Sequence, residues 1–118
     1  MKILGINAFH GDSSAALLRD GQLVFALEEE RLNRTKHWAG LPVGAANACL
    51  EGAQPDYIAI SRDPKAHLRD KLVRAALRPH RWLNLSSRAV NSVRIAQVGE
   101  LLAAQGIVSQ QRRPVHFV

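Results

Sequence analysis

The stretch that decides the fold is MKILGINAFHGDSSAALLRDGQLVFALEEERLNRTKH, residues 1–37. Lys2–Asn7 is an apolar run that ends at a polar cluster, and Ala15–Leu18 resumes the apolar pattern. Asp20-Gly21 then separates this second run from a third, Leu23–Leu27. An Asp-Gly pair between two apolar runs is typical of a tight hairpin whose two central residues have positive φ. The sequence therefore predicts three short strands joined by two turns.

The pattern then changes to a helix and a further strand. Pro42 is well placed as the first residue of a helix, and Gly52 can supply its left-handed cap. Four small or apolar residues predict the buried face of this helix: Ala45, Ala46, Cys49 and Leu50. Tyr57–Ser61 has the pattern of a buried strand. Residues 1–63 therefore predict the order β-β-β-α-β, in the α/β class with an α+β tendency, as a mixed sheet with a helix packed against it.

The second half of the chain has a different charge and pattern. Residues 64–118 carry 10 Lys/Arg against 2 Asp/Glu, whereas residues 1–63 carry 6 against 8. Helical spacing predicts one helix over 64–77 and a longer helix that Ser86 or Ser87 caps and that closes near Gly106. The predicted apolar residues of the longer helix are Val90, Val93, Val98, Leu101 and Leu102. We interpret residues 64–113 as a basic helical insertion and 114–118 as the start of a further strand, so the sheet is predicted to be incomplete.

Composition excludes several classes of function. The chain has 118 residues, about one domain, with 47% hydrophobic and 22% charged residues. It contains neither an apolar run of about 18 residues that could span a membrane nor a signal peptide pattern. Its single cysteine, Cys49, is predicted to be a buried core thiol and fits the cytoplasm. The basic half could bind nucleic acid or an acidic partner, but with 5% aromatic residues and no reader motif the sequence does not favour nucleic acid.

The polar groups of the first turn are the main candidates for chemistry. His10 could exchange a proton near neutral pH, and Asp12 could orient a hydroxyl or an amine. The alternative is a turn in which Asp12 caps its own backbone and His10 is merely exposed. Asn7, Ser13 and Ser14 flank these two residues, and either serine could simply satisfy turn amides.

A second group of charged residues follows the third strand. Strand alternation predicts that Glu28 and Glu30 lie on the opposite face from Glu29, as a solvated strand end with Arg31 paired to a neighbour. Lys36, beside His37, could grip a phosphate or a polarised carbonyl, although a surface lysine is the commoner outcome. His67, His80 and His116 have no spacing with Cys, Asp or Glu that indicates a metal site, and there is neither a Walker-type loop nor a dinucleotide-binding fingerprint.

These residues together indicate a family. The stretch LGINAFHGDSSAALLRDGQLVFALEEERLNRTKHWAGLP, residues 4–42, closely resembles the opening of the nodulation-protein-U-type O-carbamoyltransferases, which make antibiotic and nodulation-factor carbamates. The resemblance continues more loosely through PDYIAISRDP, residues 55–64. It implies the amino-terminal part of a domain of the actin, Hsp70 and sugar-kinase type, a ribonuclease-H-like fold.

The resemblance also implies a reaction and a site. A carboxy-terminal domain of such enzymes makes carbamoyladenylate from carbamoyl phosphate and ATP, and the amino-terminal domain transfers the carbamoyl group to a hydroxyl of a small-molecule acceptor. Motif matching implies three catalytic residues: His10, Asp12 and Lys36. It implies a substrate-binding group of Asn7, Ser13, Ser14 and His37. The full-length enzyme is expected to use a divalent metal as well.

Two departures from the family pattern matter. Gly11 separates the histidine from the aspartate, whereas many members place them side by side. The family's metal ligands lie in a His-His-x-x-x-His segment after a strand like VHFV, and this chain stops at Val118. We therefore expect an amino-terminal portion that is inactive without the rest of the carbamoyltransferase chain. The alternatives are an ATP-dependent phosphotransferase of the same fold and a non-catalytic basic module that binds nucleic acid or a partner.

Overall fold

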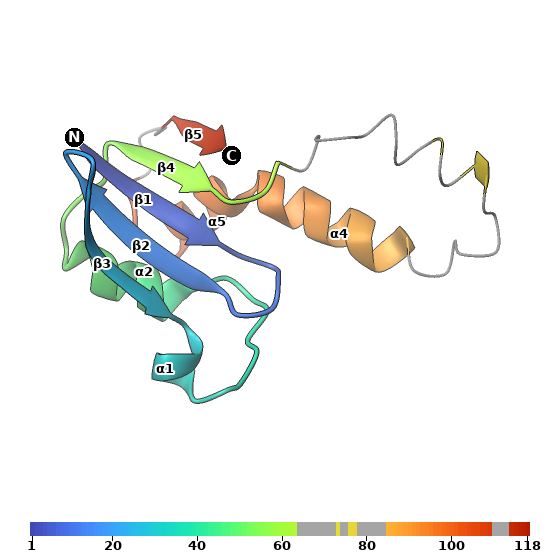
Figure 1. Ribbon diagram of the computed structural model, residues 1–118, viewed down its shortest axis with the longest axis horizontal. Helices are drawn as coiled ribbons and strands as arrows, with labels where there is room; N and C mark the ends of the chain where they lie inside the picture. Colours follow the sequence, from blue (N-terminus) through green and yellow to red (C-terminus); the bar gives the residue numbers. More distant parts are fainter. Residues whose placement is uncertain (64–72, 74–75, 78–84, 110–113) are drawn as a thin grey trace.

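The fold is a mixed α/β arrangement, seen in a computed structural model that describes residues 1–63, 73, 76–77, 85–109 and 114–118 (Figure 1). The predicted strands are confirmed, and the predicted helix over 64–77 lies almost entirely outside the described residues. The elements are β1 (Lys2–Asn7), β2 (Ser14–Arg19), β3 (Gln22–Glu28), α1 (Glu30–Asn33), α2 (Val43–Leu50), β4 (Tyr57–Ile60), α4 (Leu85–Ala96), α5 (Val98–Ala104) and β5 (Val115–Phe117).

The sheet has five strands in the order β3-β2-β1-β4-β5. The first three form an antiparallel meander, and β4 and β5 then add in parallel on the other side of β1. The hairpin between β2 and β3 confirms the Asp-Gly prediction, with φ of 51° at Asp20 and 83° at Gly21. Since β1 is central, its carboxyl end meets the turn into β2 on one side and the end of β4 on the other.

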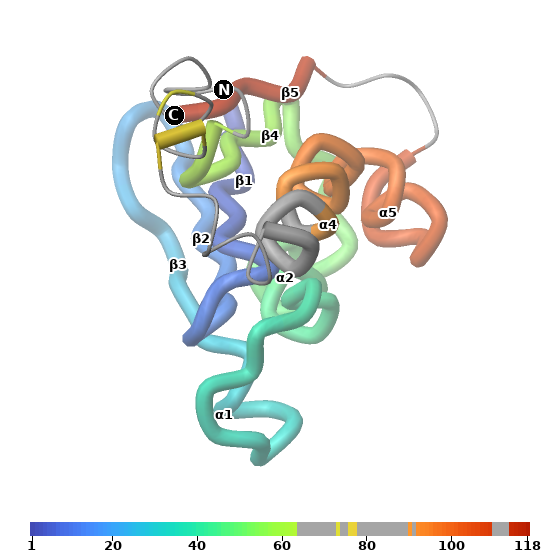
Figure 2. Tube along the Cα trace, turned by 90° about the vertical axis from the view of Figure 1, so that its right-hand side faces the viewer, coloured from blue at the N-terminus to red at the C-terminus, as the bar shows by residue number. Residues whose placement is uncertain are grey.

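The core lies between the sheet and the helices α2, α4 and α5, which lie on the same side of the sheet (Figure 2). Along β1 the alternation of side chains buries Leu4 and Ile6 and leaves Gly5 and Asn7 on the open face. The predicted face of α2 is confirmed, because all four of its residues are buried, and burial raises the pKa of the Cys49 thiol. Helices α4 and α5 and the segment after them complete the same core through Ile95, Val98, Leu102, Ile107 and Val108.

The details of the helices differ from the sequence prediction. Pro42 is the N-cap of α2 and not its first residue, and Glu51 adopts the first left-handed conformation ahead of Gly52. A short helix, α1, precedes α2, so the order is β-β-β-α-α-β and the predicted β-β-β-α-β is wrong by one element.

The prediction of one long helix over the second half is also wrong. Within residues 85–109, which the structure describes, two helices are separated at Gln97, and α4 already begins at Leu85, so neither Ser86 nor Ser87 is its cap. Val90 and Val93 are 50% and 58% exposed, so, contrary to the sequence prediction, these two residues do not belong to a buried helix face. The predicted last strand is present as β5 at the edge of the sheet, next to the exposed Val118. Among the described residues, no helix is long and apolar enough to cross a membrane.

Candidate functional site

The first turn, residues 8–13, is held against the loop of residues 34–42. Ser13 is buried, its N–H donates to the carbonyl oxygen of Trp38 (2.9 Å), and its hydroxyl donates to the carbonyl oxygen of Gly40 (2.8 Å). The N–H of Phe9 donates to the same Gly40 oxygen (3.2 Å). Both segments therefore keep a fixed mutual position, although they are far apart in the sequence.

This attachment brings Asp12 and His37 together. Nδ1 of His37 lies 2.8 Å from Oδ1 of Asp12, and the backbone N–H of His37 donates to Oε2 of Glu30 (3.1 Å). Both side chains are exposed, His37 by 80% and Asp12 by 54%. The hydrogen bond that His37 makes to Asp12 and the negative charge of Asp12 raise the pKa of His37 above its ordinary value of 6.5, with a smaller contribution from the charge of Glu30 and against an opposing effect of desolvation.

We predict that an NMR pH titration will find the pKa of His37 above 6.5 and that Asp12→Asn will bring it back toward 6.5. Because the folded-state pKa is the higher one, the pair stabilises the fold fully below the unfolded pKa of about 6.5 and loses this effect as the pH rises through the folded pKa. An identical titration midpoint in the wild type and in Asp12→Asn would contradict the observed pair.

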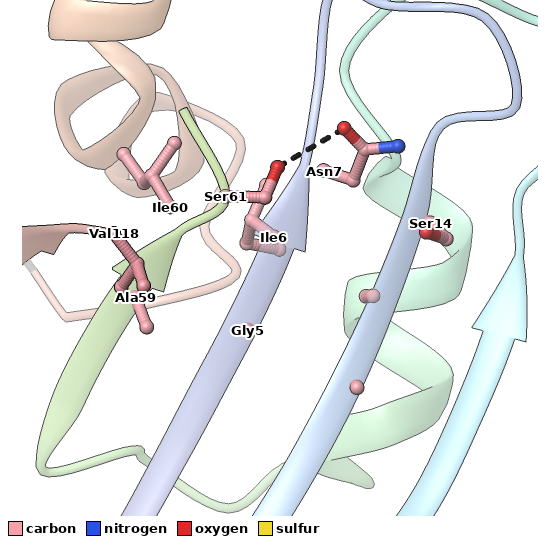
Figure 3. Close-up of a pocket in the computed structure, with 10 residues that line it drawn as sticks. Gly5, Ile6, Asn7, Ser14, Ala59, Ile60, Ser61 and Val118 are labelled. Carbon is pink, nitrogen blue, oxygen red and sulfur yellow. Dashed lines mark hydrogen bonds between the residues drawn. The ribbon is translucent and has the colours of Figure 1, made fainter. Parts of the chain in front are cut away.

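A hollow opens beside the first turn, at the carboxyl ends of the parallel strands β1 and β4. It has a volume of about 240 Å³ and is lined by Asn7, His10, Ser61 and Arg62. The hydroxyl of Ser61 donates to Oδ1 of Asn7 (3.1 Å), and Nδ2 of Asn7 donates to the carbonyl oxygen of Asp12 (3.2 Å), so the Asn7 amide has a fixed orientation (Figure 3). Ligands of α/β proteins commonly bind outside the carboxyl ends of parallel strands.

A second hollow, of about 260 Å³, continues from Asn7 and Ser61 along the open face of the sheet. Small residues on three neighbouring strands line much of it: Gly5, Ser14, Ala16 and Ala59 (Figure 3). Gly5 is paired with Ala16 on one side and with Ala59 on the other, so no large side chain fills this strip. The two hollows together offer a polar end, with a histidine and an arginine, and an apolar floor.

The structure divides the predicted site residues into three groups. Asp12 and His37 form the pair described above, and Lys36 is exposed in the same loop. Asn7, His10 and Ser14 line the hollows, with Nδ1 of His10 3.2 Å from the carbonyl oxygen of Gly11. Ser13 lies inside the protein, where it joins the turn to the loop.

The region around the turn matches a known protein family. The family model described as "Carbamoyltransferase N-terminus" matches residues 2–72, more than half of the chain. This chain belongs to that family. The resemblance that the sequence indicated is therefore confirmed, and the turn, the Asp-Gly hairpin, α2 and β4 are all parts of a carbamoyltransferase amino terminus.

Similar proteins include much longer chains. An uncharacterized protein of Synechocystis (sll1178) is 45% identical over 67 residues, which cover 52% of this chain and 11% of the relative. The nodulation protein NolNO of Sinorhizobium fredii is 53% identical over 47 residues, 40% of this chain and 7% of the relative. An uncharacterized 19.2 kDa protein of Rhizobium etli is 43% identical over 47 residues, 40% of this chain and 28% of the relative. The matched part of this carbamoyltransferase chain thus covers less than a third of each relative.

Sequence reasoning missed three residues near the site. The prediction for Glu28–Glu30 as an alternating strand end is wrong, because β3 ends at Glu28 and α1 begins at Glu30. This places Glu30 beneath the loop, where it accepts the N–H of His37. Ser61 and Arg62 directly follow β4, and only the parallel pairing of β4 with β1 reveals their position.

Glu29 has a structural position that the sequence did not indicate. It is only 8% exposed, and its carboxylate accepts the backbone N–H groups of Gly44 (3.2 Å) and Ala45 (2.7 Å) at the start of α2. A negative charge there is favourable, because the first N–H groups of a helix lack partners within the helix. The prediction that Arg31 pairs with a neighbour is confirmed by its contact with Glu28 (3.6 Å).

The carboxylates and the histidine also have to be considered as metal ligands. One atom each of Asp12, Glu30 and His37 lie within 4.8 Å of one another. Two ligands of a tetrahedral metal at about 2.0–2.1 Å would be roughly 3.3 Å apart, whereas Nδ1 of His37 and Oδ1 of Asp12 are 2.8 Å apart. This separation is that of a hydrogen bond and is too short for two ligands of a tetrahedral metal.

Proposed function

We propose that this chain is the amino-terminal part of an O-carbamoyltransferase. The enzyme would transfer a carbamoyl group from carbamoyladenylate, made from carbamoyl phosphate and ATP, to a hydroxyl of a small-molecule acceptor. The observation that carries the proposal is the family match over residues 2–72, which includes the turn and the hollows beside it. The relative NolNO is described as a nodulation protein, which agrees with the resemblance to nodulation-protein-U-type enzymes.

We propose that the chemistry takes place around the first turn. The family resemblance implies that His10 or Asp12 receives the proton of the acceptor hydroxyl, and Lys36 would stabilise charge on the carbamoyl oxygen or the leaving phosphate. Asn7, Ser14 and His37 would contact the substrates, and Ser13 would act indirectly by holding the turn against the loop. Support comes from the two hollows, whose polar end includes His10 and lies next to Asp12. A divalent metal is proposed only for the longer enzyme, and none of these steps depends on it.

We further propose that the sheet belongs to a domain of the actin, Hsp70 and sugar-kinase type, with residues 64–113 as a basic helical insertion and 114–118 as the start of the next strand. The mixed five-stranded sheet, with its antiparallel meander and parallel additions, supports this. The partner of the chain would be the remainder of the carbamoyltransferase, and the single buried cysteine supports a cytoplasmic location.

The test compares this 118-residue chain with the full encoded protein, including any coding sequence that continues past Val118. Each is incubated with carbamoyl phosphate, ATP and a panel of hydroxyl acceptors, and mass spectrometry detects carbamoylated products. We expect product only from a protein that contains the donor-forming domain, because the chain covers 7% and 11% of two long relatives. Carbamoylation by the 118-residue chain alone would contradict the proposal that a separate domain must form the carbamoyl donor.

A further inference from the structure

Resting on the proposed carbamoyl transfer, we propose that His37, oriented by Asp12, is the general base that takes the proton of the acceptor hydroxyl. Asp12 and Glu30 then act as positioning residues and not as bases. This assigns the proton transfer to a residue that motif matching had placed among the substrate-binding groups. The inference rests on the contact between Nδ1 of His37 and Oδ1 of Asp12 at 2.8 Å.

The contact determines which ring nitrogen can accept a proton. An ionised carboxylate only accepts hydrogen bonds, so Nδ1 of His37 must donate to Asp12. In the neutral ring the lone pair is then on Nε2, which points away from Asp12 on the opposite edge of the imidazole. Because 80% of the His37 side chain is exposed, a small hydroxyl compound can reach this nitrogen.

His37 is held at two points, its backbone by Glu30 and its ring by Asp12. Glu30 Oε2 accepts the backbone N–H of His37 (3.1 Å), while the turn that carries Asp12 is attached to the loop through Ser13 and Gly40. The two carboxylates that act on His37 belong to different elements, Asp12 to the first turn and Glu30 to α1. Both stabilise the imidazolium that forms when Nε2 accepts a proton, as the carboxylate does in the Ser-His-Asp arrangement.

His10 is the competing base and lacks this support. Its Nδ1 lies 3.2 Å from the carbonyl oxygen of Gly11, a neutral acceptor within its own turn. A neutral carbonyl stabilises an imidazolium less than a carboxylate does, because charge-assisted hydrogen bonds are about twice as strong. His10 lines the hollow together with Arg62, a position suited to binding the anionic part of a substrate.

The proposed step conserves atoms and charge. The acceptor oxygen attacks the carbamoyl carbon while its proton moves to Nε2 of His37, so that one carbon–oxygen bond forms. The bond between the carbamoyl carbon and the phosphate oxygen of the carbamoyladenylate then breaks, and its electron pair leaves with adenylate. The proton on His37 passes to the leaving phosphate or to water, which returns the ring to its neutral form.

The test uses His37→Asn and Asp12→Asn in the full encoded protein. Both positions have a left-handed backbone, with φ of 54° and 63°, a conformation in which Asn is well tolerated. Loss of a general base should lower kcat/KM of carbamoyl transfer by about 10²- to 10⁴-fold in His37→Asn. The matched control is His116→Asn in β5, an exposed histidine outside this site, which should keep wild-type kcat/KM.

Asp12→Asn tests the pH dependence of kcat/KM, which would not change if Asp12 had only a structural role. The amide oxygen of the new Asn still accepts a hydrogen bond from Nδ1 of His37 but carries no charge, so the pKa of His37 should fall. The part of the pH profile in which kcat/KM rises with pH should therefore move to lower pH. An unshifted pH profile, or near-normal kcat/KM in His37→Asn, overturns the inference. The inference is also overturned if adding Mg²⁺ or Zn²⁺ to metal-stripped enzyme restores activity in the wild type but not in variants of Asp12, Glu30 or His37, because these residues would then bind a metal. Absence of carbamoyl transfer in the wild type would instead overturn the proposed function.

Discussion

Replacing Leu102 with alanine should lower the free energy of unfolding by about 2–5 kcal/mol, the usual cost of removing a buried leucine side chain from a packed core. Leu102 lies in α5, is fully buried, and belongs to the same core as Leu4 of β1 and Ile58 of β4. The structure thus makes α5 part of the same folding unit as the sheet. Urea unfolding followed by circular dichroism measures the effect.

The matched control is Val93→Ala in the neighbouring helix α4. Val93 is 58% exposed, so its replacement should change the free energy of unfolding by less than about 0.5 kcal/mol. Equal, small effects at both positions would mean that α5 does not pack on the sheet. Two separate unfolding transitions would likewise contradict a shared core.

The second large effect is expected at Glu29. Glu29→Ala should lower the free energy of unfolding by about 2–3 kcal/mol, because hydrogen bonds to charged groups are strong and the substitution leaves buried N–H groups unpaired. These are the N–H groups of Gly44 and Ala45, which the carboxylate accepts at 3.2 and 2.7 Å. Glu29→Gln, which keeps an acceptor but loses the charge at the helix start, should cost less than Glu29→Ala.

Glu28→Ala is the control next in sequence. The Glu28 side chain is 46% exposed and makes one ion pair with Arg31 at 3.6 Å, and such surface pairs are worth about 0–1 kcal/mol. A difference of at least about 1 kcal/mol between Glu29→Ala and Glu28→Ala is therefore expected in thermal or urea unfolding. If the two neighbours were equally sensitive, the structural role assigned to Glu29 would be wrong.

Local patterns were sufficient to predict the strands but not their order in the sheet. Alternating apolar residues and an Asp-Gly pair depend on the chain's immediate neighbours, so β1, β2, β3 and their hairpin could be predicted closely. The helical spacing of Ala45 and Cys49 likewise identified a buried face. Helix α1 escaped prediction, because a helix of four residues is too short to show a period.

The errors lie where distant segments meet. Glu29 is buried because the start of α2, 15 residues away, supplies its hydrogen-bond donors. The same contact explains Gly44, where an added Cβ would lie 3.0 Å from Oε1 of Glu29 and 2.9 Å from Cδ1 of Leu32. Charge and spacing in EEER contain no sign of this partner, so the tract resembled a solvated strand end.

The sequence analysis predicted which residues belong to the candidate site but not which of them contact one another. The polar turn drew attention to His10 and Asp12 together, yet Asp12 contacts His37, which is 25 residues away. That contact depends on the backbone bonds that hold the turn to the loop of residues 34–42, such as the one from Ser13 to Trp38. Ser61 joins Asn7 for a similar reason, because β4 pairs with β1 across 54 residues.

The most direct test of carbamoyl transfer follows the phosphorus-containing products of the full encoded protein by ³¹P NMR. With ATP, carbamoyl phosphate and a hydroxyl acceptor, transfer through carbamoyladenylate predicts AMP, pyrophosphate and inorganic phosphate, in amounts that match the carbamoylated acceptor and only when carbamoyl phosphate is present. Formation of ADP with a phosphorylated acceptor, independent of carbamoyl phosphate, would contradict the account and identify a phosphotransferase.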